Sequence, residues 1–125
     1  MQKFILLAAA VLGALAVMIG AFGAHGLKSM LEAEGRLDTF ETAVKYHFYH
    51  TLAMLLIGML LYHIHDKLLE YAGLSMLGGV LIFSGSLYIL CLSGIRWMGA
   101  ITPLGGLLMI VGWILLFVGV YRQNF

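Results

Sequence analysis

A charge-free apolar stretch lies between Phe4 and Leu27, with no Asp, Glu, Lys or Arg in it. A helix that crosses a bilayer needs about 20 apolar residues at a rise of about 1.5 Å each, so this stretch is long enough to span one. With 62% hydrophobic and 10% charged residues and a mean hydropathy of +1.02, the chain is too apolar for a water-soluble domain of this size. We therefore interpret it as a membrane protein.

The few charged residues occur in clusters and leave three further charge-free stretches. We predict one all-α domain over residues 1–125, an integral membrane four-helix bundle in antiparallel up-down order, because the connections are short. The first apolar run greatly exceeds the ~7–15 residues of a signal-peptide core, so we expect it to be retained. The predicted spans cover about 4–24, 46–65, 71–92 and 103–121.

The segment after the first span is amphipathic. Leu27, Met30 and Leu31 fall on one side of a helix, and Gly35 is a good helix terminator. We predict a short helix over about 27–34 that lies at the membrane interface.

The second long helix should begin near Thr39, because Asp38 and Glu41 have the spacing of a capping box. It can continue to about His65, which would make it the longest helix. The fourth span has two plausible starts: Thr102 as N-cap before Pro103, or a start near Met98 with a kink at the proline.

Small residues recur at helical spacing. Ala16, Gly20 and Ala24 form a small-xxx-small pattern, and Gly105, Gly112 and Gly119 recur every seven residues. Both patterns favour close approach of neighbouring membrane helices. We expect helix packing at Gly20, Gly23, Gly26, Gly85, Gly105 and Gly112.

Polar side chains occur in every predicted span, although they are costly in a membrane unless paired. In one interpretation they bond to each other and fix the register of the helices. In the other they line one pocket for a small molecule, a lipid headgroup or an ion, with His50 facing His25 or the Ser84–Ser86 segment. The candidate cluster is His25, Tyr46, Tyr49, His50, Ser84, Ser86, Tyr88 and Thr102.

Other functional classes find less support. A haem or metal bound by His25 and His50, with His47 adding a ligand, has no carboxylate at membrane depth to assist, so we assign no metal site, keep haem or metal binding as a less favoured alternative and leave the cofactor open. A serine nucleophile would lack an acidic residue to orient its histidine, so we expect no catalysis. A formal net charge of +1 offers no basic patch for nucleic acid, and Cys91, the single cysteine, excludes an internal disulfide.

Four motifs make the chain similar to a family of small membrane proteins known as domain of unknown function 423. They are GAFGAHGL at 20–27, Tyr46-x-x-Tyr49-His50-x-Leu52, FSGSLY at 83–88 and GAITPLGG at 99–106, which together touch all four predicted spans. The resemblance implies a four-helix protein of the bacterial plasma membrane and implies no biochemical role. His47, His63 and His65 lie outside these motifs.

The sequence thus predicts a multi-pass protein of the cell membrane, plasma or inner, with a lean toward cytoplasmic termini. We expect an accessory protein or a binder of a small or lipidic molecule through the His/Tyr/Ser cluster. The alternative is a transport or channel component that acts as an oligomer. The expected partners are the lipid bilayer and a homo-oligomer or a larger membrane assembly.

Overall fold

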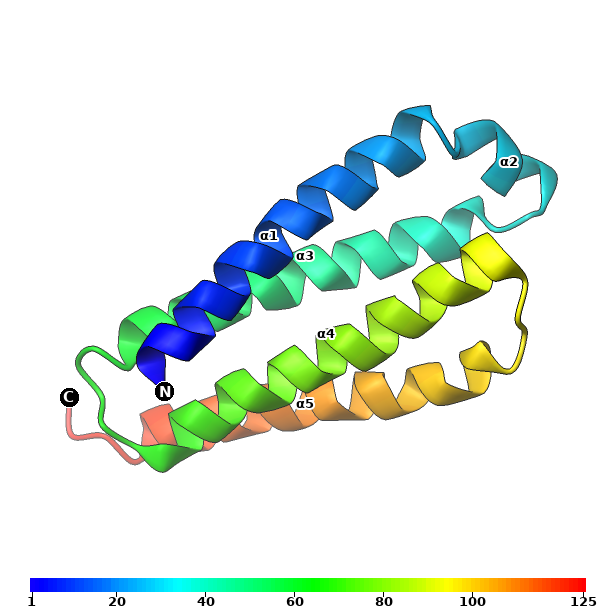
Figure 1. Cartoon of the computed structure of the whole chain (residues 1–125). Coiled ribbons are helices and arrows are strands. Elements are labelled where there is room, and N and C mark those ends of the chain that lie inside the picture. Colours follow the sequence, from blue (N-terminus) through cyan, green and yellow to red (C-terminus); the bar gives the residue numbers. More distant parts are fainter.

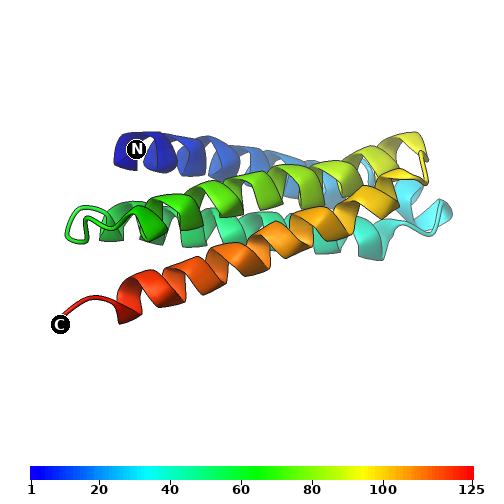
Figure 2. The same ribbon diagram turned by 90° about the horizontal axis from the view of Figure 1, so that it is seen from below.

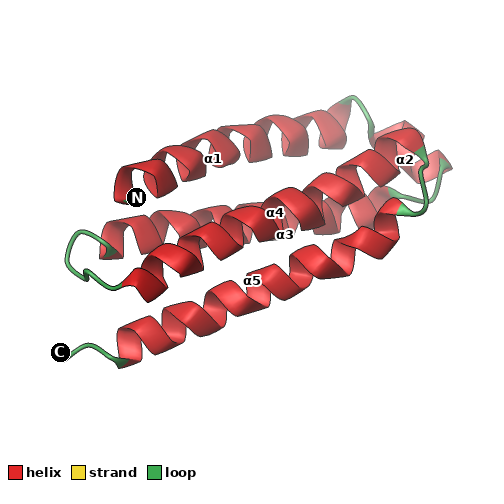
Figure 3. Ribbon diagram, turned by 60° about the horizontal axis from the view of Figure 1, so that its bottom comes forward, coloured by secondary structure: helices red, strands yellow, loops and turns green.

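The computed structural model describes residues 1–125 and contains helices and no strands. Four of the five helices are long and lie alongside one another, and short loops join them (Figure 1, Figure 3). The helices are α1 (Gln2–His25), α2 (Lys28–Ala33), α3 (Leu37–Leu60), α4 (Lys67–Ser93) and α5 (Met98–Tyr121).

Different termini and connections lie at the two ends of the molecule. The N-terminus, the α3–α4 connection and the C-terminus lie at one end, whereas α2 and the α4–α5 connection lie at the other (Figure 1, Figure 2). Helix α4 packs extensively on α5 and also on α3, while α1 packs on α3 and touches α4 at few positions. This uneven packing leaves room between α1 and α4.

The core follows a repeat of three and four residues along each long helix. In α3 the buried side chains include Phe40, Ala43, His47, His50, Met54 and Ile57. In α1 they include Ile5, Ala9, Leu12 and Ala16. Spacing of this kind places one stripe of a helix against its neighbours, as in coiled coils and bundles.

Glycines in α5 bring α4 and α5 together. A Cβ at Gly105 would collide with the backbone of Phe83, and one at Gly112 would lie 2.6 Å from Cγ of Met76. Ser75 of α4 also donates a hydrogen bond to the carbonyl of Leu108 at 2.6 Å. The seven-residue glycine spacing therefore marks the face of α5 that contacts α4.

The outer surface of the long helices is largely apolar, with large exposed side chains such as Phe22, Leu81 and Phe117. Three helices are long and apolar enough to cross a membrane: α1, α4 and α5. Helix α3 is not among them. Its first turns carry Asp38, Glu41 and Lys45, and its middle carries histidines and tyrosines that lower its mean hydropathy.

Several expected boundaries differ from the structure. Helix α3 ends at Leu60 rather than near His65, so the expected 46–65 stretch is helical only in part, and α4 with 27 residues is the longest helix. The capping box is absent: α3 begins at Leu37 with no side-chain cap, and the Thr42 hydroxyl bonds to the carbonyl of Asp38. Helix α5 begins at Met98 with Pro103 inside it, which is the second of the two starts considered.

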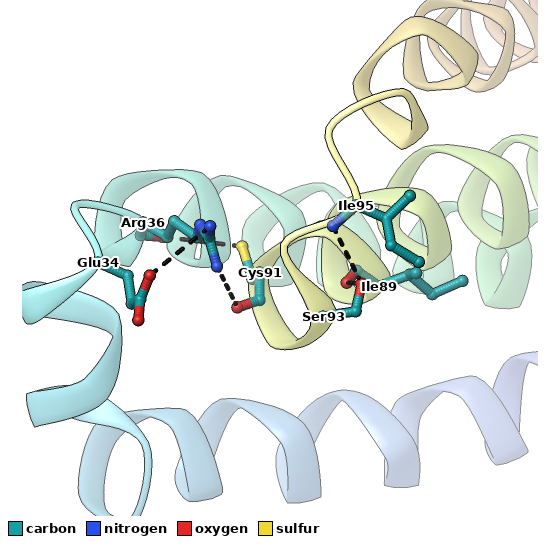
Figure 4. Close-up of polar contacts among 6 residues, drawn as sticks. All are labelled: Glu34, Arg36, Ile89, Cys91, Ser93 and Ile95. Carbon is teal, nitrogen blue, oxygen red and sulfur yellow. Dashed lines mark hydrogen bonds and ion pairs between the residues drawn. The ribbon is translucent and has the colours of Figure 1, made fainter.

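The α2 end is held together by Arg36 (Figure 4). Its guanidinium donates to the carbonyl of Cys91 at 3.5 Å and pairs with Glu34 at 3.7 Å. The thiol of Cys91 in turn points to the carbonyl of Arg36 at 3.8 Å. These contacts fix the last turn of α4 beside the start of α3, and Gly94 then ends α4 in the left-handed conformation.

Candidate functional site

His47 lies at the centre of the molecule, where α1, α3 and α4 meet, and is 3% exposed. Its Nε2 is 2.9 Å from the carbonyl of Leu12, and its Nδ1 is 2.8 Å from the hydroxyl of Tyr88. Because a carbonyl only accepts, Nε2 carries the proton, and the neutral ring then accepts from Tyr88 at Nδ1. Both nitrogens are satisfied, and the ring links three helices.

His50 is buried on a different side of α3, against α5. Its Nδ1 donates to the carbonyl of Tyr46 at 2.9 Å, and its Nε2 accepts from the indole N–H of Trp113 at 3.0 Å. The Tyr46 ring stacks on His50 with centroids 5.9 Å apart. The proton of this imidazole must therefore be on Nδ1, the opposite nitrogen from that of His47.

The serines of α4 form separate contacts. The hydroxyl of Ser84 donates to the carbonyl of Ala43 at 2.7 Å, which joins α4 to α3. Ser86 and Thr102 share a hydrogen bond at 2.6 Å, which joins α4 to α5, and Thr102 also donates to the carbonyl of Met98. Each hydroxyl is thus paired within the protein, as buried polar groups require.

The structure does not bring the eight candidate residues into one pocket. Five of them fall in three groups around α3 and α4: Tyr88 with His47, Tyr46 with His50 and Trp113, and Ser86 with Thr102. Ser84 bonds instead to the carbonyl of Ala43. Tyr49 reaches only Tyr46, ring edge to ring, and is 56% exposed.

His25 lies apart from the other candidates, exposed at the last turn of α1. The neighbouring Gly23 packs on Phe40, and His50 lies about 15 Å further along α3 at ~1.5 Å per residue. His50 thus faces Trp113, and neither His25 nor the Ser84–Ser86 segment is its partner.

The six candidate packing glycines also divide. A Cβ at Gly23 would collide with the Phe40 ring, one at Gly20 would lie 3.3 Å from Val44, and Gly105 and Gly112 meet α4. A Cβ at Gly26 would contact only Phe22, which lies one turn earlier in α1. Gly85 has nothing within 4 Å of where its Cβ would be, so it borders open space.

Two residues of these networks were missed by sequence reasoning. His47 entered the sequence prediction only as an additional metal ligand, and Trp113 was not among the candidate residues. The sequence signal that could have found His47 is the spacing of three and four residues along α3. The buried positions of the helix follow this spacing, which includes His47 and His50 and excludes Tyr46 and Tyr49.

A groove lies between α1 and α4 on the α2 side of His47. Its outer part is a cavity of about 450 Å³ with only hydrophobic lining, and its inner part is a cavity of about 150 Å³ that reaches His47 and Gly85. The two parts share Ile19 and Tyr88. We call this the α1–α4 groove, lined by Leu12, Leu15, Met18, Ile19, Phe22, Leu27, Phe40, His47, Val80, Leu81, Ser84, Gly85, Tyr88 and Leu92.

The polar groups at the base of the α1–α4 groove have little capacity left for a polar ligand. Tyr88 donates to His47, His47 donates to Leu12, and Ser84 donates to Ala43. A metal or haem at either histidine would have to displace an existing hydrogen bond. The groove suits an apolar group.

These features define a class: a helical membrane protein whose buried imidazoles join its helices. Comparison with known proteins gives the family, because residues 19–106 match the family described as "Protein of unknown function (DUF423)". The chain belongs to this family. It is accordingly a protein of the cell membrane.

Relatives match over almost the whole chain. The chain is 44% identical to the UPF0382 membrane protein of Staphylococcus saprophyticus, with 98% of this chain and 99% of that one covered. It is 42% identical to the UPF0382 membrane protein YwdK of Bacillus subtilis, with 98% of each covered. It is 35% identical to the UPF0382 inner membrane protein YgdD of Escherichia coli, over 97% of this chain and 92% of that one. No solved structure matches the fold.

Proposed function

We propose that the protein is a lipid-binding membrane protein that holds an acyl chain in the α1–α4 groove. The observation that carries the proposal is the groove itself, which is apolar on its walls and saturated in hydrogen bonds at its base. The apolar walls of the groove gain dispersion contacts when an apolar chain fills it. The polar groups at its base are already hydrogen-bonded, so they do not require a polar ligand.

The proposal includes four membrane spans in antiparallel order, with α3 as the fourth. Helix α3 of 24 residues would reach about 36 Å at ~1.5 Å per residue, enough to cross a hydrocarbon core of ~30 Å. Its two histidines at that depth, His47 and His50, are buried and bonded to α1, α4 and α5, whereas the buried hydroxyl of Thr51 has no hydrogen-bond partner. The part of α3 after Lys45 reaches only about 22 Å at ~1.5 Å per residue, so the turn that carries Glu41 and Lys45 would lie at the edge of the hydrocarbon, with its charged groups directed to the headgroups beside an interfacial α2.

The occupant is a membrane lipid because the groove opens onto the surface that faces the bilayer. Its rim residues Met18, Phe22 and Leu92 are among the large exposed hydrophobic side chains. In that setting the surrounding molecules are lipid chains, so a chain can enter the groove without leaving the hydrocarbon. The inner cavity beside Gly85 would take the part of the chain nearest the middle of the membrane.

Gly85→Leu tests this proposal, because Gly85 lines the inner cavity and a Cβ there would have nothing within 4 Å, so that a larger side chain can grow into that space. The probe is a phosphatidylcholine with a photoactivatable diazirine in the middle of one acyl chain, reconstituted with the protein. We expect crosslinks on α1 and α4 residues of the groove and a loss of most of them in the variant. Peptide mapping by mass spectrometry measures both.

Ala100→Leu is the matched control, since Ala100 is an exposed small residue of α5 outside the groove. It should leave the crosslink pattern unchanged. Crosslinks spread evenly over all four long helices, or retained at full yield in Gly85→Leu, would overturn the proposal.

A further inference from the structure

A second cavity lies on the opposite side of α1 from the α1–α4 groove. It has a volume of about 310 Å³, is open on one side and is lined by the last turns of α1, the start of α2 and the first turns of α3. Phe40 borders both cavities, and its contact with Gly23 separates them. We call this second space the α1–α3 cavity.

The α1–α3 cavity has a charged side and an apolar side. Lys28, Glu41 and Lys45 line the first, and Ala24, Phe40 and Val44 contribute to the second. The ion pairs of the structure are Arg36 with Glu34, Lys67 with Glu70 and Arg122 with Asp66. Neither lysine of the cavity has a carboxylate within ion-pair distance, so both ammonium groups are free to bind an anion.

The position of this cavity matches the boundary between hydrocarbon and headgroups. The charge-free run that begins in α1 ends at Leu27, two residues beyond the helix and immediately before Lys28, and the charges of α3 begin at the same end. Arg96 and Trp97 are also exposed at this end, in the connection from α4 to α5. Basic and aromatic side chains of this kind are typical of membrane–water interfaces.

From these observations we propose that the α1–α3 cavity binds the phosphate of an anionic phospholipid between Lys28 and Lys45. The glycerol and upper acyl carbons would pack on Ala24, Phe40 and Val44. Gly20 lets α1 approach Val44 on that wall, because a Cβ there would lie only 3.3 Å from Cγ1 of Val44. Glu41 lies in the same cavity and opposes the anion. This site uses residues outside the α1–α4 groove and does not rest on the function proposed above.

The test compares phosphatidylglycerol with phosphatidylcholine, titrated onto the full chain in detergent and counted by native mass spectrometry. We expect wild type to prefer phosphatidylglycerol. Each lysine near a membrane surface contributes about a fivefold gain in affinity for anionic lipid, so K28Q/K45Q should lose most of that preference. K28R/K45R should keep it, and E41Q should strengthen it.

The matched control is K3Q/K67Q, which removes two positive charges at the opposite end of the molecule. We expect it to stay within twofold of wild type. Equal losses in both double variants would reduce the effect to general charge attraction, and an unchanged K28Q/K45Q would remove the site; either result overturns the proposal.

Inorganic phosphate serves as the competitor that distinguishes a lipid site from a phosphate site. We expect millimolar inorganic phosphate to displace little phosphatidylglycerol, because it lacks the groups that pack on the apolar wall. Full displacement would contradict the lipid assignment. Gly85→Leu should leave the headgroup preference unchanged, so a failure of the groove and a failure of this site are distinguishable.

Discussion

His47 and His50 lie three residues apart on one helix, yet their ring protons are on opposite nitrogens. The difference follows from their acceptors: Nε2 of His47 meets the carbonyl of Leu12, and Nδ1 of His50 meets that of Tyr46. One imidazole therefore joins α3 to α1 and α4, and the other joins it to α5. A histidine serves here because it can donate on one side and accept on the other.

The contact between His47 and Tyr88 should be energetically coupled. Tyr88→Phe removes the donor to Nδ1 and leaves a buried acceptor unpaired, which costs about 1–3 kcal/mol. His47→Leu alone strands the Tyr88 hydroxyl in the same way. In a double-mutant cycle, measured by reversible unfolding in mixed micelles, we expect the double variant to lose less stability than the sum of the single variants.

Tyr62→Phe is the control for this cycle, because Tyr62 is exposed and makes no hydrogen bond through its hydroxyl. It should be close to neutral. Additive losses at His47 and Tyr88 would show that the hydrogen bond between them contributes nothing.

At the scale of helices, the close packing of α5 on α4 depends on which positions of α5 are glycine. Gly105 and Gly106 are adjacent, yet a Cβ at Gly105 meets the backbone of Phe83, whereas one at Gly106 lies 3.7 Å from its ring. Gly105→Ala should therefore force the helices apart and destabilise by about 1–3 kcal/mol. Gly106→Ala should be neutral or stabilising by up to about 1 kcal/mol, because alanine favours helix.

The same unfolding measurement compares these two alanine variants directly. Equal effects at the two positions would mean that α4 and α5 are not in backbone contact at Gly105.

How much of these helices could be predicted from the sequence depends on the kind of signal. Apolar length located α1, α4 and α5, and the seven-residue glycine spacing identified the contact face of α5, because both depend on local pattern alone. The rotation of α3 was harder. Successive residues of a helix point about 100° apart, so grouping Tyr46 and Tyr49 with His50 turned the predicted face away from His47.

The candidate site was less predictable than the helices for a related reason. The partners of His47 and His50 are a backbone carbonyl of Leu12 and the indole of Trp113, which lie 35 and 63 residues away in the chain. Nothing local marks one carbonyl among many as an acceptor. The ends of α3 were also set by packing and turns rather than by the Asp38–Glu41 pattern.

For the whole molecule, the four-span proposal fixes where the termini lie. Four crossings put both termini on one side of the membrane and Ser29 on the other, whereas three crossings by α1, α4 and α5 put the termini on opposite sides. We expect cysteines at Lys3 and Asn124 to react from the same side, and one at Ser29 from the opposite side.

The measurement is labelling of intact cells with a membrane-impermeant maleimide, in a Cys91→Ala background. Cys91 itself is buried, so its removal serves only to clear the signal. Labelling of Lys3→Cys and Asn124→Cys from opposite sides would replace four spans with three.

The pairing of α1 with α3 also bears on how the chain is made. Helix α1 is synthesised first and carries no charged residue from Phe4 onward, so it can reside in the bilayer without a partner helix. Helix α3 follows with His47, and the carbonyl of Leu12 is then already in place to accept the hydrogen bond from its Nε2–H. His50 still needs Trp113, which comes 63 residues later. On the four-span proposal, we therefore expect the helices to pack in the order of their synthesis, with α3 docking on α1 first and α5 burying His50 last.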